Sequence, residues 1–93
     1  MNRVIYKYPI DVDGFGKPCR IALPAGALPL TANKQDMSIY AWIIVDTDLP
    51  SDSYIDFYVF PTGFIEIPED LLFLSTILDG SYVWHVCCKL PER

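Results

Sequence analysis

The sequence has few of the residues from which metal sites and catalytic sites are usually built. Histidine occurs once, as His85, and the three cysteines, Cys19, Cys87 and Cys88, form no Cys-x-x-Cys pair. Neighbouring residues of a strand point to opposite faces, so Cys87 and Cys88 cannot bind one zinc ion together. There is also no Gly-rich phosphate loop and no recognisable nucleophile motif. We therefore expect no metal, no cofactor and no enzymatic activity.

The single histidine and the cysteines are better explained as structural residues. His85 stands within an apolar run, two residues from Val83 and two from Cys87. Without a nucleophile in a recognisable setting, such a histidine is more typical of a hydrogen-bonded structural residue than of a catalyst. The cysteines are expected to be buried, unreactive thiols.

Two acidic segments, residues 11–14 and 46–48, contain the alternating aspartates that are common in calcium sites. The calcium loop of a helix-loop-helix site needs Gly at its sixth position and Glu at its twelfth, whereas Gly14 is the fourth residue counted from Asp11. Aspartate side chains also accept hydrogen bonds from the backbone two residues on. We expect Asx turns of this kind in both segments.

Clustered positive charge is missing as well. The 12 acidic and 7 basic residues give a net charge of −5, and the basic residues form no run. Binding to a polynucleotide backbone depends on many phosphate contacts from clustered Lys and Arg. Duplex nucleic acid and membrane surfaces are therefore not expected partners.

The chain also lacks long apolar runs. No stretch reaches the ~20 apolar residues that a membrane helix requires, and Lys7 interrupts the first apolar stretch where a signal peptide would need an unbroken one. An odd number of cysteines, two of them adjacent, is atypical of a secreted disulfide scaffold. These features predict a soluble protein in a reducing compartment.

Apolar residues are abundant, at 52% of the chain, and they occur in short alternating runs separated by Gly and Pro. Strands are expected over residues 4–10, 19–23, 28–34, 38–45, 54–60, 71–78 and 82–88. This pattern predicts an all-β domain over residues 1–93, a small antiparallel sandwich or barrel of about seven short strands with at most one short helical turn. Pro9 indicates that the first strand lies at a sheet edge or ends at this residue.

Residues 68–78 fit two structures. Pro68 and Glu69 are typical of a helix start, but the apolar run that follows is only about two helical turns long. We favour a single helical turn near Glu69 followed by a strand. That strand would form a β-hairpin through Asp79-Gly80, because Gly adopts positive φ without steric cost.

The strand expected at residues 38–45 is apolar on both faces. Ile39, Ala41, Ile43 and Val45 alternate with Tyr40, Trp42 and Ile44. Such a strand is expected to be central and covered on both sides, by a second sheet or by a second subunit. Because so short a chain has few elements to supply two covers, the pattern predicts a homo-oligomer.

Cations and aromatic rings near the start of the chain suggest where a small anion would bind. Arg3 and Lys7 share one face of the first expected strand, and the strand at residues 19–23 is expected to lie beside it. Stacking on an aromatic ring is the usual way to hold a base. The predicted ligand-binding residues are Arg3, Lys7, Arg20, Tyr6, Tyr8 and Trp42.

Five landmarks are spread along nearly the whole chain, at residues 5–9 (Ile-Tyr-Lys-Tyr-Pro), 23–27 (Leu-Pro-Ala-Gly-Ala), 41–46 (Ala-Trp-Ile-Ile-Val-Asp), 61–70 and 80–86, the last of which contains Trp84-His85-Val86. In this order they resemble a family of small, functionally uncharacterised proteins of tailed bacteriophages and prophages. Where that family usually has Gly-Thr-Gly followed by His, this chain has Pro61-Thr62-Gly63-Phe64. A role of that histidine therefore does not transfer, and the family supplies no catalytic residues.

The resemblance implies a phage accessory protein that acts by binding in the cytoplasm of a bacterial host. One expected mechanism is sequestration of a small host immune-signalling nucleotide in pockets of a homo-oligomer. The alternatives are an inhibitor that covers a surface of a host defence enzyme or nuclease, in keeping with the net charge of −5, and a virion accessory component.

Overall fold

A computed structural model describes residues 1–12 and 14–91. The strands are β1 (Arg3–Ile10), β2 (Cys19–Leu23), β3 (Leu28–Gln35), β4 (Ser38–Asp46), β5 (Ser53–Pro61), β6 (Leu72–Asp79) and β7 (Tyr82–Lys89). The predicted all-β class and the seven strands are confirmed, each close to its expected bounds. The strand that we favoured over residues 71–78 is present as β6. The helical turn expected before it is not found, because Glu69 lies in a turn and the described residues contain no helix. Accordingly, no helix within these residues could cross a membrane.

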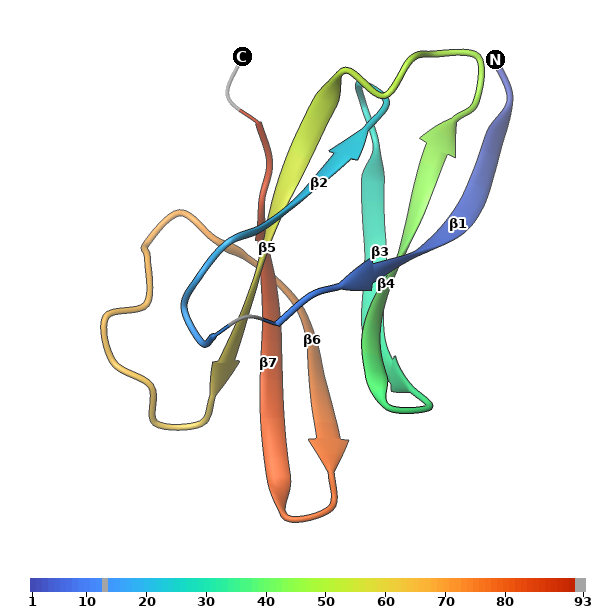
Figure 1. The fold of residues 1–93 in the computed structure, drawn as a ribbon. Coiled ribbons are helices and arrows are strands. Elements are labelled where there is room, and N and C mark those ends of the chain that lie inside the picture. Colours follow the sequence, from blue (N-terminus) through green and yellow to red (C-terminus); the bar gives the residue numbers. More distant parts are fainter. Residues whose placement is uncertain (13, 92–93) are drawn as a thin grey trace.

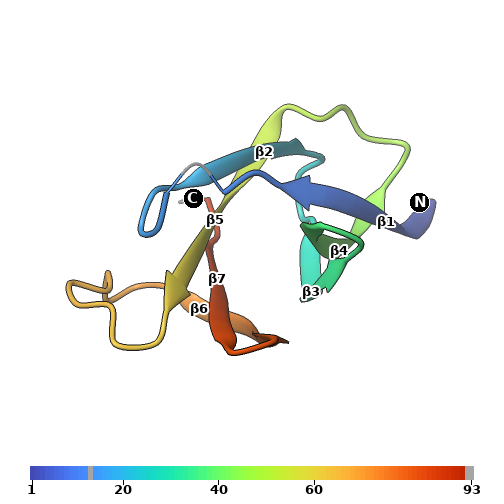
Figure 2. The same ribbon diagram turned by 60° about the horizontal axis from the view of Figure 1, so that its bottom comes forward.

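The strands form two antiparallel sheets that pack face to face. One is three-stranded, in the order β1-β4-β3, and the other is four-stranded, in the order β2-β5-β7-β6. Figures 1 and 2 show the two sheets as the layers of a sandwich. The core between them is made of alternate residues from both layers, including Ile43 of β4, Phe57 of β5 and Val86 of β7, all fully buried.

β4 is the central strand of its sheet, as predicted. Its inner residues Ala41, Ile43 and Val45 are buried against the four-stranded sheet. Its outer residues Tyr40 and Trp42 stay partly exposed. The sequence predicts that both faces of β4 are covered. Within one chain only the inner face is covered, by the four-stranded sheet.

The pairing predicted between the first two strands is wrong. β1 pairs with β4, and β2 pairs with β5 in the other sheet. The connection over residues 11–18 carries two glycines and a proline and crosses from one layer to the other instead of making a tight hairpin. Pro9 does lie in an edge strand, since β1 ends the three-stranded sheet.

The predicted hairpin of β6 and β7 is confirmed, with its centre shifted by one residue. Asp79 and Tyr82 are the last paired residues, which leaves Gly80 and Ser81 as the two-residue loop. Gly80 has a φ of 61°. Glycine at the first central position is the requirement of a type II′ turn, whose twist matches that of the flanking strands.

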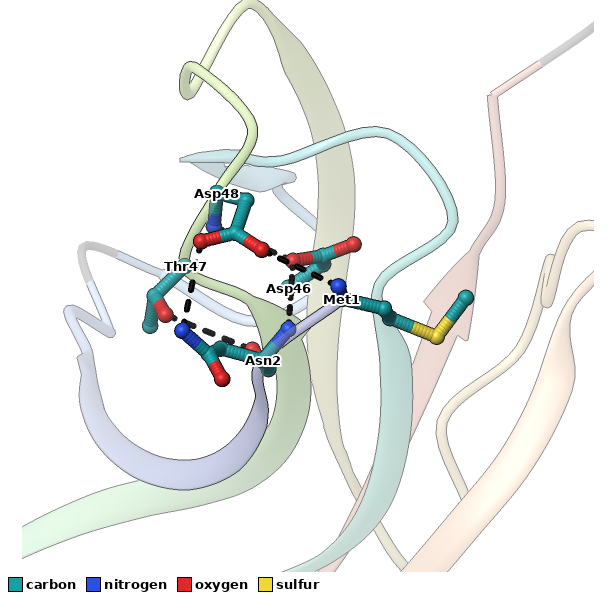
Figure 3. A network of polar contacts seen from close by, with 5 residues as sticks. All are labelled: Met1, Asn2, Asp46, Thr47 and Asp48. Atoms are coloured by element: carbon teal, nitrogen blue, oxygen red, sulfur yellow. Dashed lines mark hydrogen bonds and ion pairs between the residues drawn. The ribbon is translucent and has the colours of Figure 1, made fainter.

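The segment before β1 is bound to the loop after β4 by a polar network (Figure 3). The Asp46 Oδ1 atom accepts hydrogen bonds from the backbone N–H of Asp48 at 3.0 Å and of Asn2 at 3.2 Å. Thr47 donates its backbone N–H to the Asn2 carbonyl at 2.9 Å, and the Met1 ammonium lies 3.2 Å from Asp48 Oδ2. The Asp46–Asp48 contact is the Asx turn that the sequence predicts. The contacts of Asn2 and Met1 with residues 46–48 hold the start of β1 against the end of β4.

Replacing Asp46 with Ala is expected to destabilise the fold by about 1 kcal/mol, because two backbone N–H groups lose their acceptor. For a domain of this size that is a fall in Tm of roughly 4–8 °C, measurable by thermal circular dichroism. Asp52→Ala is the matched control, since it removes the same charge from an exposed loop position. An equal effect of the two substitutions would contradict the role of the network.

Candidate functional site

Three of the six predicted ligand-binding residues lie on one surface, the outer face of the three-stranded sheet. Arg3 and Lys7 point outward from β1, and Trp42 stands directly opposite Lys7 on β4. We call this surface the Trp42 face. Its members are Arg3, Ile5 and Lys7 of β1, Tyr40, Trp42 and Ile44 of β4, and Leu28 and Thr31 of β3.

The other three predicted residues lie elsewhere. Tyr6 and Tyr8 are opposite Ile43 and Ala41 in the β1–β4 register, so they project from the inner side of β1. Arg20 lies on β2, in the other sheet. The structure therefore brings together Arg3, Lys7 and Trp42 but neither the two tyrosines nor Arg20.

Lys7 carries one of the two positive charges of the Trp42 face. Its Nζ atom donates a hydrogen bond to Gln35 Oε1 at 2.8 Å and lies 4.5 Å from the centre of the Tyr40 ring. Among the described residues it has no carboxylate partner. A cation over an aromatic ring, with a tryptophan opposite, is an arrangement that suits a ligand with both a ring and a negative charge.

Arg20 is held in a structural ion pair. Its Nε and Nη2 atoms donate to the two carboxylate oxygens of Asp56, at 2.9 and 3.1 Å, and its guanidinium lies 3.7 Å from the centre of the Tyr54 ring. Asp56 is 8% exposed. The hydrogen bonds to Asp56 raise the pKa of Arg20 above its ordinary value. A carboxylate at this depth needs such a partner, because an unpaired buried charge is costly.

A cavity of about 350 Å³ lies beside this pair, lined by Arg20, Tyr54, Asp56, Tyr58, Lys89 and Leu90. Both of its cations have carboxylate partners: Arg20 binds Asp56, and Lys89 Nζ lies 3.1 Å from Asp70 Oδ2. A multiply charged anion would have to compete with these carboxylates. The Trp42 face is therefore the better candidate for an anionic ligand.

His85 is hydrogen-bonded on both sides, as expected of a structural histidine. Thr62 Oγ1 lies 2.9 Å from Nε2, and Thr76 Oγ1 lies 3.1 Å from Nδ1.

Burial raises the pKa of the Cys87 thiol and raises that of Cys88 to about 11. Both thiols are therefore protonated at neutral pH and are poor nucleophiles.

The described residues of the two acidic segments belong to no cluster that could hold a metal. No group of three His, Cys, Asp or Glu side chains with that geometry occurs in residues 1–12 and 14–91. The Asx turn expected at residues 11–14 includes Asp13, which lies outside the described residues.

One group of polar residues was not predicted from the sequence. Lys34 and Asp79, from β3 and β6, form an ion pair of 2.7 Å at a second cavity, and Trp84 Nε1 lies 3.4 Å from the same carboxylate. Asp79 is recognisable in the sequence only as a turn residue. Its partner is 45 positions away, and only the packing of the two sheets brings them together.

Replacing Arg20 with Ala is expected to lower the Tm by several degrees, because it leaves the Asp56 carboxylate nearly buried without its bidentate partner. Lys17→Ala, the loss of an exposed cation, should leave the Tm nearly unchanged.

The double variant Arg20→Ala/Asp56→Asn should recover part of that loss of Tm, because it removes the orphaned charge. Additive effects of the two substitutions in thermal unfolding would show that the pair is not coupled.

Comparison with known proteins gives a family for this chain. No curated protein and no solved structure matches it. A family model described as a domain of unknown function, DUF7352, matches residues 1–93. The family description names neither a source organism nor an activity. The phage origin of this protein therefore stays a prediction. Since the match spans every residue from 1 to 93, the chain belongs to the DUF7352 family.

Proposed function

We propose that this protein is a non-enzymatic binding protein that works as a homo-oligomer and takes a small nucleotide at the Trp42 face. The observation that carries the proposal is the combination found there. Lys7, without a carboxylate partner among the described residues, stands opposite Trp42 on an apolar sheet face that the chain leaves uncovered.

The apolar character of the Trp42 face supports assembly. Ile5 is 56% exposed and Leu28 is 48% exposed, Ile44 lies between them in the sheet, and Trp42 is two residues from Ile44 on β4. A contiguous exposed apolar patch is characteristic of an interaction surface. A second copy of the chain presents the same patch, so an isologous contact would bury both patches at once.

The charges of the same face support an anionic ligand. A protein of net charge −5 attracts a nucleotide only where local cations overcome the general field. A two-fold contact through this face would bring Lys7 and Arg3 of both subunits into one interface, and a bound anion would offset their repulsion. Stacking on Trp42 would add roughly 1–3 kcal/mol for a base.

The biological role proposed with this chemistry is that of a phage accessory protein. By holding a signalling nucleotide in the host cytoplasm, it would blunt a defence response without catalysing any reaction. The support for this role is the landmark resemblance together with the ligand chemistry of the Trp42 face.

A second candidate function, inhibition of a host protein by covering its surface, is favoured by the other outer face of the sandwich. Beside β6, the side chains of Ile65, Phe73 and Leu78 are 66–76% exposed. The loop that contains Ile65 folds over this sheet, where the Phe64 ring lies 5.3 Å from that of Phe60. An exposed apolar surface on an acidic protein suits a basic partner protein. A virion accessory component would also need a surface of this kind for its contacts.

We expect light scattering at micromolar concentration to give the mass of a dimer or a larger closed oligomer. Ile5→Lys should shift the protein toward the monomer, because it places a new charge in the apolar part of the Trp42 face. Leu78→Lys, the same change on the opposite outer face, is the control and should leave the mass unchanged. A monomer in the unmodified protein would contradict the assembly.

We expect calorimetry to detect binding of at least one cyclic dinucleotide, cyclic trinucleotide or ADP-ribose derivative. Lys7→Ala should weaken this binding at least tenfold, about 1.4 kcal/mol, through loss of the open cation. Lys17→Ala controls for the change in net charge. No heat with any of these compounds would refute the nucleotide proposal and direct attention to the surface beside β6.

A further inference from the structure

A cavity of about 340 Å³ opens between the two sheets, next to the hairpin turns β3–β4 and β6–β7. In Figure 1 both turns lie at the lower end of the molecule. The apolar part of the wall comes from both layers and from the β1–β2 connection. It includes Ile10, Phe15, Ile39, Val59 and Trp84. A mostly apolar hollow of this size with few polar groups is typical of a small-molecule site.

The aromatic part of the wall is preformed. The rings of Phe15 and Trp84 are stacked, with centroids 5.2 Å apart and planes inclined by 23°. Phe15 remains 43% exposed. Both rings line the cavity. Trp84 is also stacked on Tyr82, with ring centroids 5.4 Å apart, so Phe15 supplies most of the aromatic surface that stays open.

The polar groups of the cavity offer a donor next to an acceptor. Lys34 Nζ donates to Asp79 Oδ1 at 2.7 Å, and Trp84 Nε1 points to Asp79 Oδ2 at 3.4 Å. The ammonium group keeps N–H bonds beyond the one used on Asp79, and each carboxylate oxygen keeps a lone pair. Both side chains are 32% exposed, so this remaining capacity is accessible.

The charge of the lining disfavours anions. Lys34 balances Asp79, and Asp11 adds a second carboxylate to the wall. Hydrogen bonds from Lys34 and, to a smaller extent, from Trp84 hold the pKa of Asp79 below its ordinary value, so this carboxylate is ionised at neutral pH. A ligand here is favoured if it is neutral, in contrast to the ligand of the Trp42 face.

We propose that this cavity binds a neutral heteroaromatic compound of nucleobase size whose edge carries a hydrogen-bond acceptor beside an N–H donor. Lys34 donates to the acceptor, Asp79 accepts from the N–H group, and the Phe15–Trp84 surface packs against the ring. The site shares no residue with the Trp42 face, so it extends the proposed function and does not depend on it.

A structural role for the ion pair alone accounts for less of the geometry. Lys34 and Asp79 do join β3 to β6, and a pair that spans two sheets helps to hold them. That role requires neither an open volume nor an exposed aromatic surface beside the pair. The ligand proposal accounts for all three features.

The test uses the indole N–H signals of the unmodified protein in ¹⁵N-correlated NMR spectra. The chain has two tryptophans, so Trp84 reports on the cavity, Trp42 on the Trp42 face, and Trp42→Phe assigns them. The probes are inosine, 1-methylinosine and inosine monophosphate. The first offers an acceptor beside an N–H donor, the second lacks that donor, and the third adds negative charge.

Inosine at millimolar concentration is expected to shift the Trp84 signal, with at least tenfold weaker binding of 1-methylinosine and weaker binding of the monophosphate. Asp79→Asn and Lys34→Gln should each reduce inosine binding, whereas Lys17→Gln, which removes an exposed cation outside both sites, should not. No shift of Trp84, or equal binding of inosine and 1-methylinosine, would overturn the proposal. Neither result bears on the Trp42 face, which the Trp42 signal reports separately.

Discussion

The constraint on which the rest of the structure depends is that a two-layer sandwich has only one interior. β4 is apolar on both faces, and only its inner face, with Ala41, Ile43 and Val45, can enter that interior. Its outer face must therefore be covered by another molecule or remain in water. The same limit applies to the four-stranded sheet, where the loop around Phe64 covers part of the outer face and leaves Phe73 exposed.

Charge pairing decides which of the surfaces can attract an anion. Arg20, Lys34 and Lys89 each lie within an ion-pair distance of a carboxylate, so their charges are locally balanced. Lys7 is bonded to an amide and to an aromatic ring instead. Although the chain as a whole is acidic, Lys7 gives the Trp42 face a positive charge that has no carboxylate partner among the described residues.

The sequence was sufficient to predict the strands, because alternation and turn residues are local signals. The bounds of β2 and the hairpin at Gly80 came directly from such signals. The partner of β1 did not, because β2 and β4 both offer an alternating apolar face and only the packing of the whole sandwich selects between them. For this reason the prediction that Arg20 lies near Arg3 and Lys7 failed, since β2 belongs to the other sheet. The Lys34–Asp79 pair depends on the same long-range packing.

The two proposed sites relate differently to assembly. A nucleotide at the Trp42 face would lie where two subunits meet, so its charge would offset the repulsion between the paired Lys7 and Arg3 side chains. Binding and oligomerisation would then be coupled, and each would strengthen the other by the same factor. The Lys34–Asp79 cavity lies between the sheets of one chain, and its lining includes no residue of the Trp42 face. A neutral ligand there would make no contact with the Trp42 face, so we expect a single subunit and an assembly to bind it with similar affinity.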